Sequence, residues 1–145
     1  MGKRRPLAID YHDAIVKQRG FKLVQRLSAV RPGDVIAIKY PPDAENSGHI
    51  MLVAETPRSI PGTRPEISGT EQWEVTVIDS SRSSHGKTDT RRRDDGSFGS
   101  GVGEGVFRIY TNRDGTVAGY TWSTFANSDY YDQNTRHLVI ERLDR

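Results

Sequence analysis

The chain of 145 residues contains no cysteine, and this absence removes several kinds of site at once. Without thiols it can form neither a disulfide bond nor a thiolate metal centre, and it cannot itself supply a cysteine nucleophile. Long apolar runs are missing as well. None approaches the roughly 18 residues that a membrane-spanning helix needs, and none follows the basic amino terminus as a signal peptide would require. We therefore expect no membrane span and no cleaved leader, while the cellular compartment stays open.

An excess of one charge sign is also missing. The 21 basic and 19 acidic residues leave a formal net charge of +2, too small a surplus to mark a nucleic-acid-binding surface without clustering. The densest charge run, TRRRDD at 90–95, largely neutralises itself. We therefore expect no nucleic-acid partner. The apolar residues, 34% of the chain, occur in short runs, which favours one folded domain over disorder.

The apolar runs predict an α+β chain with one main helix and about six strands. Residues 7–19 have helical spacing, with Pro6 and Gly20 as natural boundaries. The later runs have the length or alternation of strands, and they lie at 34–40, 49–55, 73–79, 106–111, 117–122 and 137–143. Consecutive strands after one helix favour a mostly antiparallel sheet that curls into a half-barrel. We expect a single domain over residues 1–145, with its strand-rich part at about 33–143.

Two polar residues stand at the ends of neighbouring predicted strands. His49 opens the strand at 49–55, and Asp79 closes the strand at 73–79. If the two strands are antiparallel neighbours, the start of one lies beside the end of the other, so the imidazole and the carboxylate can meet. Such a pair is the base and the orienting acid of a nucleophile–His–acid site. The alternative is structural: His49 caps a strand and Asp79 begins a turn.

A polar stretch after Asp79 adds further candidates. Together with His49 and Asp79, His85 and Asp89 could bind a divalent metal through nitrogen and oxygen ligands. Their spacing matches no standard zinc signature, so we predict no metal and no cofactor. The alternative is a hydrogen-bonded polar loop in which Asp89 and Arg91 form ion pairs. The residues predicted to line a cleft or to bind ligand are Ser47, Gly48, Ser80, Ser81, His85, Asp89 and Arg91.

The glycine-rich stretch GSGVGEG at 99–105 invites comparison with a phosphate-binding loop. Its context argues against that function, because a dinucleotide loop opens a helix, whereas the strand at 106–111 follows here. We expect the glycines to permit tight turns or the close approach of another part of the backbone.

Three motifs carry a resemblance to a known family. They are VRPGDVIAI at 30–38, GHIMLVAE at 48–55 and WEVTVIDSS at 73–81. In this order they resemble the barrel half of NlpC-type and CHAP-type papain-like cysteine amidohydrolases. In that superfamily a turn of the form Leu-Arg-Pro-Gly-Asp leads into the first barrel strand, a Gly-His motif brings the catalytic base on the second, and a polar third residue follows. The resemblance implies a papain-like half-barrel with His49 as the base and Asp79 as the third residue.

The resemblance also implies hydrolysis of amide bonds in cell-wall peptides by a cysteine thiolate that the histidine activates. This chain departs from the pattern, because the helix predicted at 7–19 carries no Cys, Ser or Thr. Either a Cys-bearing helix upstream has been lost, or the protein is a natural pseudoenzyme. In both cases the chain alone should have negligible amidase activity, at most the roughly 10³–10⁴-fold over water that broken triads retain.

The leading hypothesis is therefore the C-terminal part, or an inactive relative, of a bacterial peptidoglycan-type amidohydrolase whose partner is a cell-wall peptide or a similar amide. One alternative is a non-catalytic module that binds peptide or glycan on the same scaffold. Another is a metal-dependent hydrolase that uses His49, Asp79 and His85. A missing helix would expose apolar surface on the sheet, so we also expect some self-association.

Overall fold

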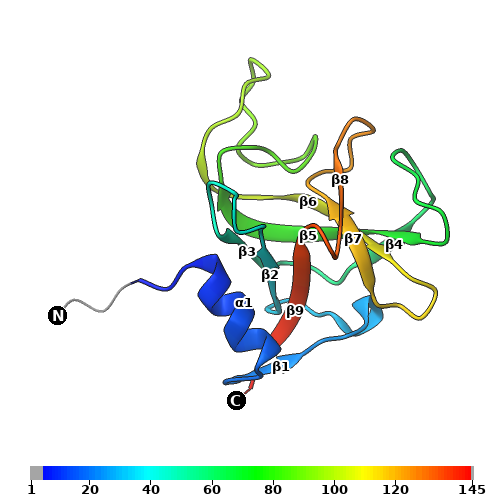
Figure 1. The fold of residues 1–145 in the computed structure, drawn as a ribbon. Coiled ribbons are helices and arrows are strands. Elements are labelled where there is room, and N and C mark those ends of the chain that lie inside the picture. Colours follow the sequence, from blue (N-terminus) through cyan, green and yellow to red (C-terminus); the bar gives the residue numbers. More distant parts are fainter. Residues whose placement is uncertain (1–4, 145) are drawn as a thin grey trace.

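The computed structural model describes residues 5–144 and is mostly β (Figure 1). Within this range the helical parts are α1 (Ala8–Val16) and one 3-10 turn, η1 (Leu27–Ala29). The described strands are β1 (Phe21–Leu23), β2 (Val35–Lys39), β3 (Gly48–Val53), β4 (Arg58–Ile60), β5 (Glu71–Ser81), β6 (Gly101–Thr111), β7 (Val117–Thr121), β8 (Tyr130–Asp132) and β9 (His137–Leu143). They form one antiparallel sheet in the order β1-β9-β2-β3-β5-β6-β7-β8, and β4 pairs with β5 beside this path.

The expected papain-like α+β half-barrel with six strands is therefore wrong. All six predicted strands are present, but three more join them in one nine-stranded sheet, and α1 has only nine residues. The additional strands β1, β4 and β8 have three residues each, too few to show a period-2 pattern, and they form because a neighbouring strand pairs with them. The helix ends at Val16 and not at the predicted Arg19. Gln18 and Gly20 beyond it have positive φ angles of 50° and 77°, which do not continue a right-handed helix.

The sheet curls around one apolar core. Alternate side chains of five strands point inward and are buried: Ile36, Ile38, Met51, Val53, Val75, Val77, Phe107, Ile109, Leu138 and Ile140. Tyr120 of β7 and Tyr131 of β8 pack in the same cluster, although these strands lie far from β9 in the strand order. The Gln133 side chain links the two ends of the sheet, because it donates to the carbonyl of Leu138 and accepts from its N–H.

Helix α1 lies on the outer face of the sheet, over β1, β9 and β2 (Figure 1). Its Ile15 is fully buried and packs with Ala37 and Val139, the residues that alternate with the inward-pointing ones. His12 of α1 lies with Nε2 2.8 Å from Nδ1 of His137, which ties the helix to β9. At nine residues α1 is the longest helix of residues 5–144, and no helix in that range reaches the length and apolarity of a membrane span.

Candidate functional site

His49 is placed at one end of the curled sheet by the glycine that precedes it. Gly48 has a φ of 153°, and a β-carbon there would collide with the carbonyl oxygen of Ile38 on β2, so glycine alone permits this close approach. Alternation along β3 then turns the His49 side chain inward, to the face that Met51 shares. The imidazole sits between core and solvent, with 18% of its side chain exposed.

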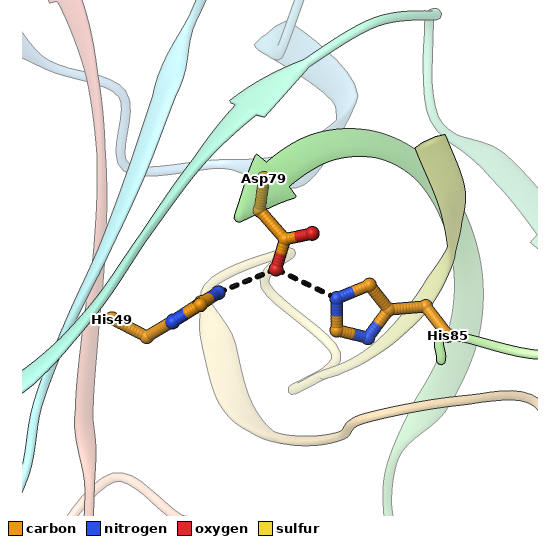
Figure 2. A group of neighbouring side chains, drawn as sticks. All are labelled: His49, Asp79 and His85. Carbon is orange, nitrogen blue, oxygen red and sulfur yellow. Dashed lines mark hydrogen bonds and ion pairs between the residues drawn. The ribbon is translucent and has the colours of Figure 1, made fainter. Parts of the chain in front are cut away.

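Asp79 reaches the same end of the sheet on β5. It follows Val77 by two residues on the inward face, and β5 runs antiparallel to β3. Its side chain is fully buried, and its Oδ2 lies 2.5 Å from Nε2 of His49 (Figure 2). Because a carboxylate only accepts hydrogen bonds, Nε2 carries the proton, and the lone pair of the neutral imidazole is on Nδ1. Nδ1 of His49 has no hydrogen-bond partner among residues 5–144, so it is available to a ligand.

A second imidazole shares the carboxylate oxygen that His49 uses. Figure 2 shows His85 and His49 on opposite sides of Asp79, and Nε2 of His85 is 2.8 Å from Oδ2. The other ring nitrogen of His85, Nδ1, is 2.8 Å from the carbonyl oxygen of Trp122. Both nitrogens of this fully buried ring therefore face acceptors. His85 satisfies both contacts as an imidazolium, or with a cation between Nε2 and the carboxylate.

Arg91 and Asp89 complete this buried network. Nη1 of Arg91 donates to Oδ1 of Asp79 at 2.9 Å, and its Nε and Nη2 donate to the two oxygens of Asp89 at 2.9 and 2.8 Å. Burial alone would raise the pKa of Asp79, but the hydrogen bonds from His49 and His85 outweigh it and hold this pKa far below its usual value. Two carboxylates and one guanidinium leave one negative charge in this part of the network.

Two glycines of β6 make room for this network. Gly103 and Gly105 pair with Asp79 and Val77 of β5. A β-carbon at Gly103 would lie 2.6 Å from Cγ of Arg91, and one at Gly105 would lie 2.5 Å from Oδ2 of Asp89. The glycine-rich stretch thus allows the loop that carries the polar network to lie directly on the strand.

The same three side chains have the chemistry of metal ligands. The ligand atoms of His49, Asp79 and His85 all lie within 4.8 Å of one another. The hydrogen bond between Nδ1 of His85 and a backbone carbonyl would leave Nε2 free to bind a metal, which is the usual arrangement behind a metal-binding histidine. The group could therefore hold a divalent cation after small shifts of the side chains.

A polar cleft of about 500 Å³ opens beside His49, a size that accommodates a short peptide. Trp122 forms part of its wall, and the indole meets the imidazole of His49 edge-on, with 5.2 Å between ring centroids. The rest of the lining is mostly polar and consists of Tyr40, Glu45, Asn46, Gly48, Ser80, Ser81, Arg82, Ser83 and Arg136.

Eight of the nine predicted site residues divide into two groups. Those on the cleft wall are His49, Gly48, Ser80 and Ser81. Those buried behind it are Asp79, His85, Asp89 and Arg91. Ser47 lines a neighbouring hollow beside α1 instead. Sequence reasoning missed Tyr40 and Arg136, which no motif marks. They meet because β2 pairs with β9, with Lys39 opposite His137, and this pairing of strands far apart in the sequence has no local signal.

The comparisons with known proteins identify one relative. No protein-family model matches the chain, and no solved structure matches it. The chain is similar to an uncharacterized protein of Acanthamoeba polyphaga mimivirus, with 38% identity over 149 aligned residues. The alignment includes 97% of this chain and 65% of the viral protein, so the chain spans just under two thirds of that relative's length. This similarity carries no activity with it, and the function is therefore argued from the site.

Proposed function

We propose that this chain carries the general-base part of a hydrolytic site for amide bonds in peptides, of the kind that cell-wall cysteine amidohydrolases use. His49 is the base, Asp79 orients it, and a thiol nucleophile comes from outside the 145 residues. One observation carries the proposal: Nε2 of His49 is held by a buried carboxylate, while Nδ1 has no partner among residues 5–144 and the ring lines a cleft. The order of the motifs around Gly48 and Asp79 supports the same assignment.

In such a site Nδ1 of His49 takes the proton of the thiol, and the thiolate attacks the carbonyl carbon of the amide. The imidazolium then gives its proton to the leaving nitrogen, and the acyl group stays on sulfur as a thioester. Water, deprotonated by His49, cleaves the thioester to a carboxylic acid and the free thiol. Asp79 assists twice, because it fixes the tautomer with an unprotonated Nδ1 and its charge stabilises the imidazolium. Proton transfer by a positioned base of this kind contributes about 10²–10⁴-fold to the rate. His85 and Arg91 hold Asp79 in place and do not touch the substrate.

A second candidate is a metal-dependent hydrolase at the same residues. The observation that favours it is the convergence of two imidazole nitrogens on one carboxylate oxygen, with the backbone carbonyl of Trp122 behind His85. A divalent cation held by His49, Asp79 and His85 would supply an activated water and would need no thiol.

A reporter thiol tests the base directly. Ser81 and Ser83 line the cleft with His49, and Ser28 is exposed elsewhere. We expect Ser81→Cys or Ser83→Cys to react with iodoacetamide at pH 7 about tenfold faster than Ser28→Cys, because a neighbouring base favours the thiolate. Adding His49→Gln should abolish the excess rate in the cleft variants and leave the Ser28→Cys rate unchanged. Alkylation rates of Ser81→Cys and Ser83→Cys that do not change when His49→Gln is added would contradict the proposal.

Metal content separates the two candidates. The thiol-type site predicts substoichiometric zinc, manganese and iron in protein purified at neutral pH, measured by elemental mass spectrometry. A stoichiometric ion that His85→Gln removes would favour the metal-dependent hydrolase. Hydrolysis of a peptide amide by the unmodified chain that a chelator stops would decide in the same direction.

A further inference from the structure

Arg136 is a cation in the cleft wall without an anionic partner among the described residues. Its guanidinium carbon lies 4.4 Å from the ring centroid of Tyr40 and 3.8 Å from that of Tyr131. The charged group is thus packed against two phenol rings. Within residues 5–144 no carboxylate lies at ion-pair distance from it, and no backbone carbonyl accepts a hydrogen bond from its side chain.

Other arginines that the fold holds in place have such acceptors. Arg91 is bonded to two carboxylates, and Arg142 is bonded to the carboxylate of Asp34. Arg108, which is fully buried, donates to a threonine hydroxyl and to two backbone carbonyls. Arg136 differs from these three because neither a carboxylate nor a backbone carbonyl within residues 5–144 accepts a hydrogen bond from its side chain, which interacts instead with the neutral hydroxyl of Tyr120.

The aromatic contacts leave part of the guanidinium available. Rings stacked over a guanidinium stabilise the charge through its flat face, while the N–H donors remain at the edge of the plane. This edge is a rigid fork that matches the two oxygens of a carboxylate. Stacking also restricts the side chain, so less conformational freedom is lost when an anion binds.

The rest of the cleft favours an anion as well. Arg82 also lines it and forms no ion pair with a residue of the described range, and Glu45 is the one acidic residue on the described wall. Burial raises the pKa of the Tyr40 phenol to about 12, so its hydroxyl stays protonated and can donate to an anion. The neighbouring residues thus add positive charge and a hydrogen-bond donor.

We propose that Arg136 binds a carboxylate of the ligand and so makes the cleft selective for peptides with a free acidic group near the bond presented to His49. The inference rests on the proposed function in one respect, because it takes this cleft as the substrate site. It assigns Arg136 a role in specificity and no part in the chemical step.

Two dipeptide probes test the inference without any turnover. N-acetyl-Ala-Ala and its C-terminal amide differ only in the carboxylate, and both can be titrated while amide signals of the cleft are followed by NMR. We expect the acid to bind the wild-type chain about tenfold more tightly than the amide, since a charge-assisted fork–carboxylate contact is worth about 1.4 kcal/mol or more. Arg136→Gln should bring the two affinities together, and Arg136→Lys should keep part of the difference.

The matched control is Arg113→Gln, which removes the same charge from an exposed residue of the β6–β7 turn and should keep the preference. Equal affinities for acid and amide, a preference that survives Arg136→Gln, or no binding of either probe would overturn the inference. None of these results would contradict the role of His49 as a base, which the reporter-thiol experiment tests separately. Conversely, if the reactivity of the cleft thiols does not depend on His49, the proposed role of His49 as a base is wrong, but a preference of the cleft for the carboxylate probe can still be observed.

Discussion

Two buried carboxyl groups on opposite faces of the sheet have opposite pKa shifts. Asp79 points inward beside the cleft and accepts hydrogen bonds from two imidazoles and a guanidinium. Burial would raise its pKa, but the hydrogen bonds from His49 and His85 hold this pKa far below the usual value. Glu141 lies on β9, on the outer face, and neither of its oxygens has a hydrogen-bond partner among residues 5–144. Burial therefore raises the pKa of Glu141 to about 7.

The comparison separates burial from pairing. Burial opposes the charge of both groups, so the difference comes from the donors that surround Asp79 and are absent around Glu141. A charged carboxylate behind a partly exposed imidazole can assist proton transfer by that imidazole. A carboxyl group that burial leaves without partners weakens the fold at neutral pH instead. The predictions that follow alter one side of this comparison at a time.

Removing the charge of Asp79 should have the largest effect. Asp79→Asn withdraws one partner from Arg91 and an anion from His85, and breaking a buried ion pair in this way costs about 3–5 kcal/mol of unfolding free energy. Urea unfolding at pH 7 measures the loss. Asp43→Asn, at an exposed position, is the control and should change stability by less than about 0.5 kcal/mol.

The same variant has a pH signature. Because the folded-state pKa of Asp79 is depressed, its stabilising contribution is present above the ordinary Asp value of 3.8 and is lost as pH falls below it. The free energy of unfolding of Asp79→Asn should therefore fall less steeply than that of the wild type as the pH is lowered below 3.8. A cost below about 1 kcal/mol at pH 7 would show that the network around Asp79 does not hold the site together.

Removing the charge of Glu141 should raise the free energy of unfolding, in contrast to Asp79→Asn, and the change should be smaller. A raised folded-state pKa means that the unfolded chain releases its proton near the ordinary value of 4.5, while the folded chain keeps it up to about pH 7. Stability then falls as pH rises through this window and levels off above it. We expect Glu141→Gln to stabilise the protein by about 2–3 kcal/mol at pH 8 and to have little effect at pH 4.

Urea unfolding of wild type and Glu141→Gln across pH 4 to 8 provides the measurement. Leu143→Gln, an exposed position on the same strand, controls for the change of side chain on β9. Parallel pH profiles of the wild type and Glu141→Gln would contradict the prediction, because they would show that the buried carboxyl group of Glu141 has a hydrogen-bond partner and a normal pKa.

The smallest effect should come from narrowing the space for the Asp79 network. A β-carbon in Gly105→Ala would press on Asp89 and His85, and such overpacking costs about 1–3 kcal/mol. Gly62→Ala is the matched control, because nothing lies within 4 Å of the added carbon there. Thermal unfolding compares the two. Equal midpoints would show that the loop moves away from β6 without strain.

The sequence predicts much of the sheet and the centre of the site for identifiable reasons. The runs at β2, β3, β5, β6, β7 and β9 are long enough to show alternation or an apolar stretch, so the sequence predicts these strands. The meeting of His49 and Asp79 follows from antiparallel neighbours. Strands of three residues have no pattern of their own, so local periodicity does not predict β1, β4 and β8, and the predicted α+β class with six strands is wrong.

The absence of a thiol and the Gly-His start of β3 were determined by the sequence alone, because they depend on residue identity and on local backbone geometry. Only the tertiary structure decided that His85 shares the carboxylate of Asp79, that Arg136 stands in the cleft, and that Glu141 has no partner within residues 5–144. The physical reason is that the partners of a buried polar group are chosen by strand register and loop packing over long sequence distances, which local periodicity does not encode.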